Sequence, residues 1–234
     1  MRTRAVLLAA LMSPVGADAL AADALHWSGD LGLGIERTQA SAPGASARTW
    51  ALPYAYGELG PLFVREDTFG AKLVRVGWGA LEVVGRVSTE GSDGDGPKLA
   101  HRRNPRPMGF GTFQETPWGG LFFDAFADTV SGGTLLEVSY AAELPLGPVN
   151  LYPQVGVTHR SARYVAHLYG EAAYLPGAST TPEVQISSEL PLTDNWVLLA
   201  HAQYELFDRA IRDSPRVATN SRFSALIVLA WRFK

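Results

Sequence analysis

Two side chains in the sequence have the spacing of a hydrolytic nucleophile and its base. His159 and Ser161 are separated by Arg160, and a His in this position can accept the Ser proton if a carboxylate orients its ring. Such His-x-Ser pairs occur in barrel hydrolases that act on lipids. The Asn-Gly or Asn-Ala expected after the Ser is absent, because Ala162 and Arg163 follow. We therefore interpret His159 as a residue where a strand meets a loop, and we predict no catalytic residues.

Metal and cofactor chemistry have little support in the sequence. The absence of Cys excludes disulfides, thiolate zinc sites and Cys nucleophiles. The His residues form no close pair in the sequence, so a metal site would need convergence in space. Gly32-Leu33-Gly34 lacks the following helix of a dinucleotide site, and we interpret it as a strand with two lumen-facing glycines. We predict neither a metal ion nor a cofactor. The five His residues are His26, His101, His159, His167 and His201.

A basic segment, His101-Arg102-Arg103-Asn104-Pro105-Arg106, has two interpretations. Arg binds phosphate in a fork, so the segment could contact the phosphates of lipopolysaccharide. Alternatively, it is a solvated loop whose charge is offset by acidic residues from Glu90 onward, since exposed charge pairs are common and weak. The second interpretation is favoured, and the role of Arg102, Arg103 and Arg106 stays open.

The elements that carry these residues are strands. From His26 to Arg37 the residue types alternate with a period of two, which places successive side chains on opposite faces. The pattern recurs at 50–56, 81–88, 136–144, 183–190, 196–206 and 222–233, and it is blurred at 62–78 and 120–128. The last strand is the clearest because its apolar stripe ends in aromatics, as in outer-membrane barrels. That stripe is Phe223, Ala225, Ile227, Leu229, Trp231 and Phe233.

The N-terminus has the features of a secretory signal peptide. Arg2 and Arg4 precede the apolar run Ala5–Met12, and small residues follow at Ala19-Leu20-Ala21. We predict a cleaved signal peptide at residues 1–21 and a single mature domain at residues 22–234. The chain is 47% hydrophobic and 18% charged, which argues against disorder. Its formal net charge of −3 argues against nucleic-acid binding.

The connections between strands alternate in length along much of the chain. Short turns at 56–60, 116–119, 144–148 and 191–195 fall between longer connections at 38–48, 90–107, 160–182 and 208–220. This predicts an all-β fold, a transmembrane antiparallel up-and-down β-barrel with long extracellular loops and short periplasmic turns. We expect about 12 strands, with ten as the alternative. A soluble β-sandwich or lipocalin-like barrel would also alternate, but strand length and the terminal stripe favour the membrane barrel.

The opposite faces of these strands carry polar side chains that we expect to point into the lumen. Mixed charges in a small barrel usually pair and fill it, whereas in a wider barrel they line a water path. The sequence therefore leaves undecided whether the barrel conducts. The expected lumen-facing residues are Asp30, Glu36, Glu82, Arg86, Glu137, Glu143, Gln154, Gln185, Glu189, Gln203, Glu205, Arg222 and Arg232.

Several short motifs resemble those of one family. Tyr164-Val165-Ala166-His167-Leu168-Tyr169-Gly170 is similar to a Tyr-Met-x-x-Tyr-Phe-Gly element, and Ala210-Ile211-Arg212-Asp213-Ser214-Pro215 is similar to an Ala-x-x-Ser-Pro element before the final strand. Both are found in the MltA-interacting protein (MipA/OmpV) family of outer-membrane proteins. The stretch Leu190–Trp196 also resembles a strand-turn-strand of that family. The sequence departs from the family at Thr38–Gly44, where Pro-x-Tyr-x-Gly-Ser is expected, and in ending on Lys234.

The resemblance implies a non-enzymatic outer-membrane barrel, a scaffold that links a murein lytic transglycosylase to a peptidoglycan synthase such as a penicillin-binding protein. A small porin or solute channel is the alternative, and a lipid-acting barrel hydrolase is the third option. The other expected partners are outer-membrane lipid and lipopolysaccharide, and the barrel is expected to be monomeric. The family-like loop residues are Tyr164, Tyr169, Gly170, Ala210, Ser214 and Pro215. The candidate contacts for a periplasmic partner, on the expected short turns, are Glu58, Trp118, Pro145 and Asp194.

Overall fold

The structure is a computed structural model that describes residues 26–93 and 99–234. The signal peptide expected at residues 1–21 lies outside these ranges. Within them the chain is almost entirely β-structure, with three short helices. The elements are β1(Trp27–Thr38), β2(Arg48–Leu59), β3(Leu62–Arg65), β4(Thr68–Val76), β5(Gly79–Arg86), α1(Glu90–Asp93), β6(Pro107–Thr116), β7(Gly119–Asp128), β8(Thr134–Ala142), β9(Leu144–Leu146), β10(Val149–Arg160), α2(Ala162–Tyr169), β11(Ser179–Pro191), β12(Trp196–Leu206), α3(Arg209–Arg212) and β13(Ser221–Phe233).

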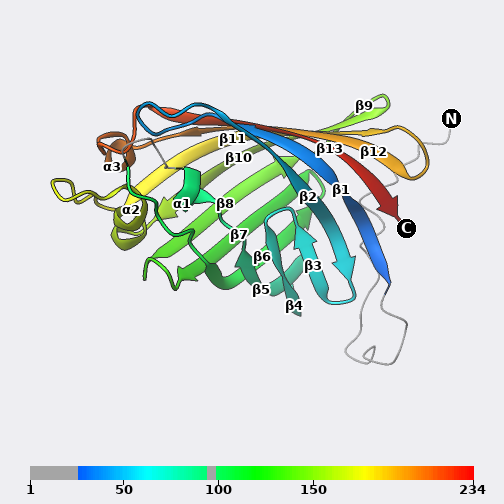
Figure 1. Cartoon of the computed structure of the whole chain (residues 1–234). Helices are drawn as coiled ribbons and strands as arrows, with labels where there is room; N and C mark the ends of the chain where they lie inside the picture. Colours follow the sequence, from blue (N-terminus) through cyan, green and yellow to red (C-terminus); the bar gives the residue numbers. More distant parts are fainter. Residues whose placement is uncertain (1–25, 94–98) are drawn as a thin grey trace.

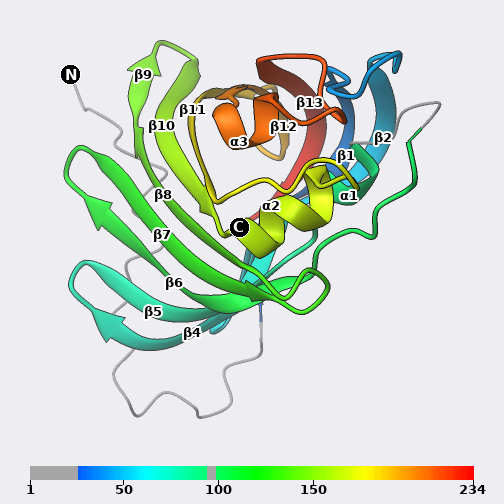
Figure 2. The same cartoon turned by 90° about the vertical axis from the view of Figure 1, so that its left-hand side faces the viewer.

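These strands close into one antiparallel barrel (Figure 1). Each strand pairs with the next along the chain, and β13 pairs with β1 to complete the circle. β9 continues the line of β8 along β10, so the barrel has 12 strands, and the predicted fold is confirmed. Figure 2 looks into the end that holds the helices and the long connections, which we call the loop end. The opposite end, with the short turns and both ends of the described chain, is the turn end (Figure 1).

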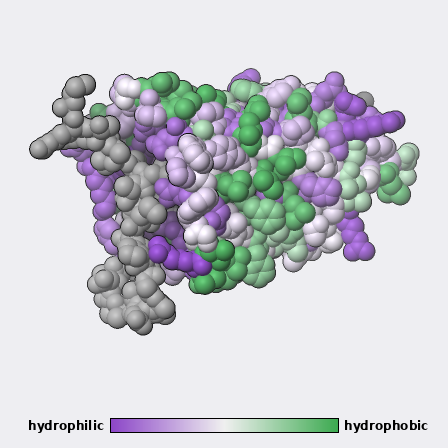
Figure 3. Space-filling model, turned by 180° about the vertical axis from the view of Figure 1, so that it is seen from behind, coloured by the Kyte–Doolittle hydropathy of each residue, from purple (hydrophilic) through white to green (hydrophobic). Residues whose placement is uncertain are grey.

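The outer face of the barrel carries the large apolar side chains. Leu33 is 72% exposed and Ile227 is 60% exposed, although both lie in the middle of strands. On the face seen in Figure 3, hydrophobic side chains gather over the middle of the molecule. An exposed apolar band around a closed barrel is the surface that meets lipid in a membrane-spanning barrel. Among the described residues, no helix has the length and apolar character needed to cross a membrane.

The inner face is held by ion pairs that cross between strands. Arg232 on β13 donates to Asp30 on β1 at 2.6 Å and to Glu189 on β11 at 2.6 Å. Arg65 on β3 donates to both carboxylate oxygens of Glu82 on β5, at 2.7 and 2.8 Å. Because these charges are paired, they can lie inside a barrel that excludes lipid.

The blurred stretch from Leu62 to Trp78 is two strands rather than one. β3 has four residues, and the chain reverses at Glu66, which has a φ of 57°. A bulge between Lys72 and Val74 then shifts the register of β4, so alternation cannot persist there. The resulting β3–β4 hairpin is much shorter than its neighbour β2, which has 12 residues.

Candidate functional site

The loop end is filled by α2 and α3, which we call the cap (Figure 2). In α2, Tyr164, Val165, Leu168 and Tyr169 are all buried, because the sequence repeats apolar residues on one side of a helix. In α3, Ile211 is fully buried, and Asp208 begins the helix by accepting a hydrogen bond from the Ile211 amide. The cap packs on Phe63, Val84, Phe126 and Leu135, which point inward from the wall.

Next to α2 lies a largely buried group of charged and polar side chains, which we call the cap cluster: Glu90, Arg160, Tyr164, Glu205 and Arg222. Arg160 donates to Glu90 at 2.8 Å and to Glu205 at 3.1 Å, and Arg222 donates to the other oxygen of Glu205 at 2.8 Å. The Tyr164 hydroxyl donates to Glu90 at 2.5 Å. The cluster therefore links α1 and α2 to the strands β10, β12 and β13.

The protonation of the loop residues follows from this packing. Burial alone would raise the pKa of Glu90, but the charges of Arg160 and Arg222 and the hydrogen bond from Tyr164 bring its pKa below the usual value. Burial, with the neighbouring charge of Glu90, raises the pKa of Tyr164 far above its usual range. Tyr164 therefore remains a donor and Glu90 remains an acceptor at neutral pH.

The two family-like loop motifs meet in the cap. The Ser214 hydroxyl donates to the carbonyl of Tyr169 at 2.6 Å, and the Tyr174 hydroxyl donates to the carbonyl of Ala210 at 3.1 Å. Arg102, from the basic segment, donates to the carbonyl of Gly170 at 2.6 Å. The motifs on separate loops are thus parts of one structure. Pro215 directly follows Ser214 in the same turn.

The sequence motifs do not identify Arg216, although this residue holds the same part of the cap in place. Its side chain is almost fully buried, and it donates to Glu171 at 2.6 Å and to the carbonyl of Ala100 at 2.7 Å. The hydrogen bond from Arg216 holds the pKa of Glu171 below its usual value. Its position directly after the Ser-Pro motif is the one signal in the sequence that could have indicated it.

The turn end holds the residues expected to contact a partner. Trp118 is 78% exposed, and Pro145 and Asp194 are also exposed. Glu58 is different, because it lies inside β2 and forms a 2.5 Å ion pair with Lys72. The sequence reasoning missed Trp78, which is 68% exposed in the turn beside that of Trp118.

The His159 and Ser161 side chains have separate partners. The His159 ring contacts the Thr180 hydroxyl at 2.8 Å, and the Ser161 hydroxyl accepts from the Thr134 amide at 2.8 Å. The geometry therefore does not assemble a nucleophile with its base. In the part of the chain that the structure describes, no three His, Asp or Glu side chains are placed to share a metal ion.

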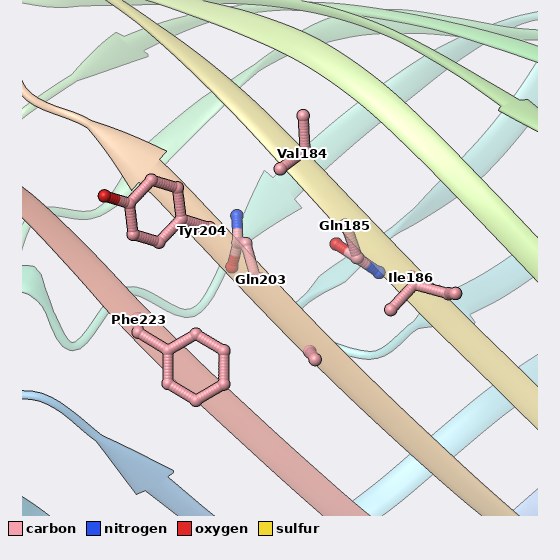
Figure 4. A pocket seen from close by; sticks show the side chains of 7 residues that line it. Val184, Gln185, Ile186, Gln203, Tyr204 and Phe223 are labelled. Carbon is pink, nitrogen blue, oxygen red and sulfur yellow. The ribbon is translucent and has the colours of Figure 1, made fainter.

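A shallow hollow of about 300 Å³ lies on the wall formed by β11, β12 and β13 (Figure 4). It forms at Ala202 because this small residue stands between larger neighbours. Val184 and Ile186 flank it on β11, and Tyr204 and Phe223 flank it towards the loop end. Gln185 and Gln203 also line the hollow. Because the large exposed side chains around it are hydrophobic, the hollow belongs to the outer apolar surface of the barrel.

Among solved structures, the chain is similar to Ail, the attachment invasion locus protein of Yersinia pestis, with 11% identity over 88% of this chain and 97% of that chain. The TM-score is 0.28, and so distant a likeness says nothing about activity. No match was found among curated proteins.

A family model described as MltA-interacting protein MipA matches residues 31–233. The matched range runs from β1 to β13 and includes both loop motifs of the cap. The resemblance inferred from those motifs is thereby confirmed, and the chain belongs to the MltA-interacting protein MipA family.

Proposed function

We propose that this protein is an outer-membrane barrel that acts as a non-enzymatic scaffold in the periplasm. The loop end would face the cell exterior, and the turn end would present its short turns to a murein lytic transglycosylase and a peptidoglycan synthase of the penicillin-binding class. The family name supports the first of these partners, since it describes an MltA-interacting protein. The barrel itself would be a monomer surrounded by outer-membrane lipid and lipopolysaccharide.

The observation that carries the proposal is the exposure of two Trp side chains on neighbouring turns. Trp78 and Trp118 follow strands β4 and β6, on either side of β5, so both lie at the turn end of the same wall. Trp is enriched among residues that dominate binding energy at protein interfaces. The packed cap at the other end supports a scaffold over a porin, because it fills the lumen beneath the loops.

Removal of these two side chains should weaken partner capture. We expect the double variant Trp78→Ala, Trp118→Ala to bind a purified lytic transglycosylase at least about tenfold more weakly, since interface Trp residues often contribute about 2 kcal/mol or more. Substitution of Asp194 in the turn before β12 should give a smaller loss. Binding can be measured by surface plasmon resonance with the barrel in detergent.

Leu175→Ala provides the matched control. Leu175 is 86% exposed, but it lies at the loop end, between α2 and β11. Its substitution should leave transglycosylase binding unchanged. Equal binding by the wild-type barrel and the double Trp variant would contradict the proposed contact surface.

A further inference from the structure

Along one side of β2, the barrel wall that the described residues form is incomplete. β2 pairs with β1 along its whole length, but β3 reaches only from Leu59 up to Tyr56. The short β3–β4 hairpin ends there, where the Glu66 amide donates to the carbonyl of Ala55 at 3.1 Å. Among the described residues, no backbone group pairs with the β3-facing edge of β2 between Thr49 and Pro53. We call this stretch the free edge.

The free edge presents a small number of backbone groups to its surroundings. The Ala55 carbonyl points towards β3, and strand groups alternate, so Thr49, Ala51 and Pro53 point the same way. Pro53 has no amide hydrogen, so the donors are the amides of Thr49 and Ala51, and the acceptors are three carbonyls. Such groups cannot be left against hydrocarbon, because each costs several kcal/mol there.

The outward side chains beside the free edge are small. Thr49, Ala51 and Pro53 are all exposed, and no large apolar residue stands among them. The larger residues of this stretch, Trp50 and Leu52, lie on the other face, opposite Glu36 and Gly34. A molecule in the outer half of the membrane can therefore approach the backbone closely.

Arg side chains lie on the strand next to the free edge and in the segment that leads into β6. Arg37 is exposed on the neighbouring strand β1 and donates to the Thr49 hydroxyl at 3.4 Å. Residues 99–106 cross this sector of the loop end before β6 begins (Figure 2), and Arg103 and Arg106 are exposed in that segment. Within the described residues, neither guanidinium contacts a carboxylate. Glu90, which could have offset them, is instead paired with Arg160.

We propose that the free edge and these Arg side chains form a binding site for a phosphorylated glycolipid of the outer leaflet. Its phosphates would lie between Arg103, Arg106 and the free amides, since Arg binds phosphate in a fork. Its sugar hydroxyls would donate to the free carbonyls, and its acyl chains would pack on Ala51 and Pro53. The inference rests on the outer-membrane location proposed above.

Native mass spectrometry of the purified full-length barrel in detergent can test the site. We expect one molecule of bisphosphorylated lipid A to bind at least about tenfold more tightly than the same lipid without phosphates, because only the phosphates accept charge-assisted hydrogen bonds from Arg103 and Arg106. The variant Arg103→Gln, Arg106→Gln should lose that preference. Ala51→Phe, which covers the free edge without changing charge, should also weaken binding.

Two controls show whether binding depends on this site. Arg209→Gln removes an exposed Arg at the same end of the barrel, on α3, and should leave lipid binding unchanged. Heat-dependent mobility on gels shows that each variant is folded. Equal affinity for the phosphorylated and dephosphorylated lipids would overturn the proposal, as would inorganic pyrophosphate that binds as tightly as the lipid. The assay contains no transglycosylase, so its outcome is independent of the scaffold measurement.

Discussion

At the scale of single residues, the cap cluster shows what the sequence could and could not reveal. The His-x-Ser spacing draws attention to His159 and Ser161, but it is Arg160, which stands between them, that is buried and forms ion pairs. The sequence pattern could not indicate this, because the partners Glu90 and Glu205 are 70 and 45 positions away. The family resemblance did identify Tyr164 and Ser214, which lie in the same cap.

The stabilisation from Glu90 should depend on pH with a known sign. Its pKa is lowered in the folded protein, so its contribution is present at neutral pH and is lost as the pH falls through that lowered value. At pH 7 we expect Glu90→Gln to lower the free energy of unfolding by about 1–3 kcal/mol. The difference from the wild type should shrink as the pH falls below about 4. Urea unfolding in lipid vesicles at both pH values measures this.

Asp194→Asn is the control for this measurement, since Asp194 lies exposed in a turn and is distant from the cap. It should change the free energy of unfolding little at either pH. A difference between the wild type and Glu90→Gln that stays constant between the two pH values would refute the assignment.

At the scale of elements, the regular strands were predictable and the β3–β4 hairpin was not. The alternation at 222–233 predicts the bounds of β13 to within one residue, because one face of the strand meets lipid and the other meets the lumen. The alternation fails at 62–78 because a four-residue strand, a reversal at Glu66 and a bulge at Lys72 each break the period. Glu58 was expected in a turn, but it lies in a strand. β2 extends to Leu59, so the turn that follows is tighter than the sequence suggested.

Gly32 of β1 lies where the first and last strands of the barrel approach each other closely. A Cβ at Gly32 would lie 2.4 Å from the carbonyl oxygen of Leu229 and 2.7 Å from the Cα of Ala230. Because these atoms belong to the backbone of β13, they cannot move away without disturbing the β1–β13 pairing. We therefore expect Gly32→Val to reduce the fraction of chain that refolds into detergent micelles at least severalfold.

Gly177→Val is the matched comparison for that refolding assay. Nothing lies within 4 Å of a Cβ built at Gly177, which stands in the connection after α2. This variant should refold as the wild type does, as judged by gel mobility and by β-sheet circular dichroism. Equal refolding of both Val variants would show that close approach at β1 does not limit closure.

At the scale of the whole molecule, the barrel followed from the sequence, whereas the filled loop end did not. Periodicity and connection length predict strand number and direction because they reflect the bilayer. They do not reveal that α2 and α3 fold back over the lumen, since those helices are short and are stabilised by residues from distant strands. The sequence alone therefore could not decide whether the barrel conducts ions or solutes.

The cap makes a specific prediction about conduction. In a planar lipid bilayer we expect the wild-type barrel to give no single-channel steps at neutral pH, because Tyr164 and Ile211 are fully buried within the lumen. Replacement of residues 162–169 with a short Gly-Ser linker should produce steps. The milder variant Tyr164→Ala, Ile211→Ala provides a second measurement if the linker variant does not fold. Regular steps from the wild-type barrel would favour the porin alternative.

The pairing of the first and last strands has a consequence for the order of biosynthetic events. The ion pair between Asp30 and Arg232 joins residues 202 positions apart, and β1 has no second partner until β13 arrives. If the barrel is exported to the outer membrane as proposed above, the early segments keep their apolar faces uncovered until the final strand has been synthesised and exported. Topologies of this kind fold slowly and are prone to aggregate while incomplete. The protein should consequently depend on periplasmic holdase chaperones during transit more strongly than exported proteins whose contacts are local.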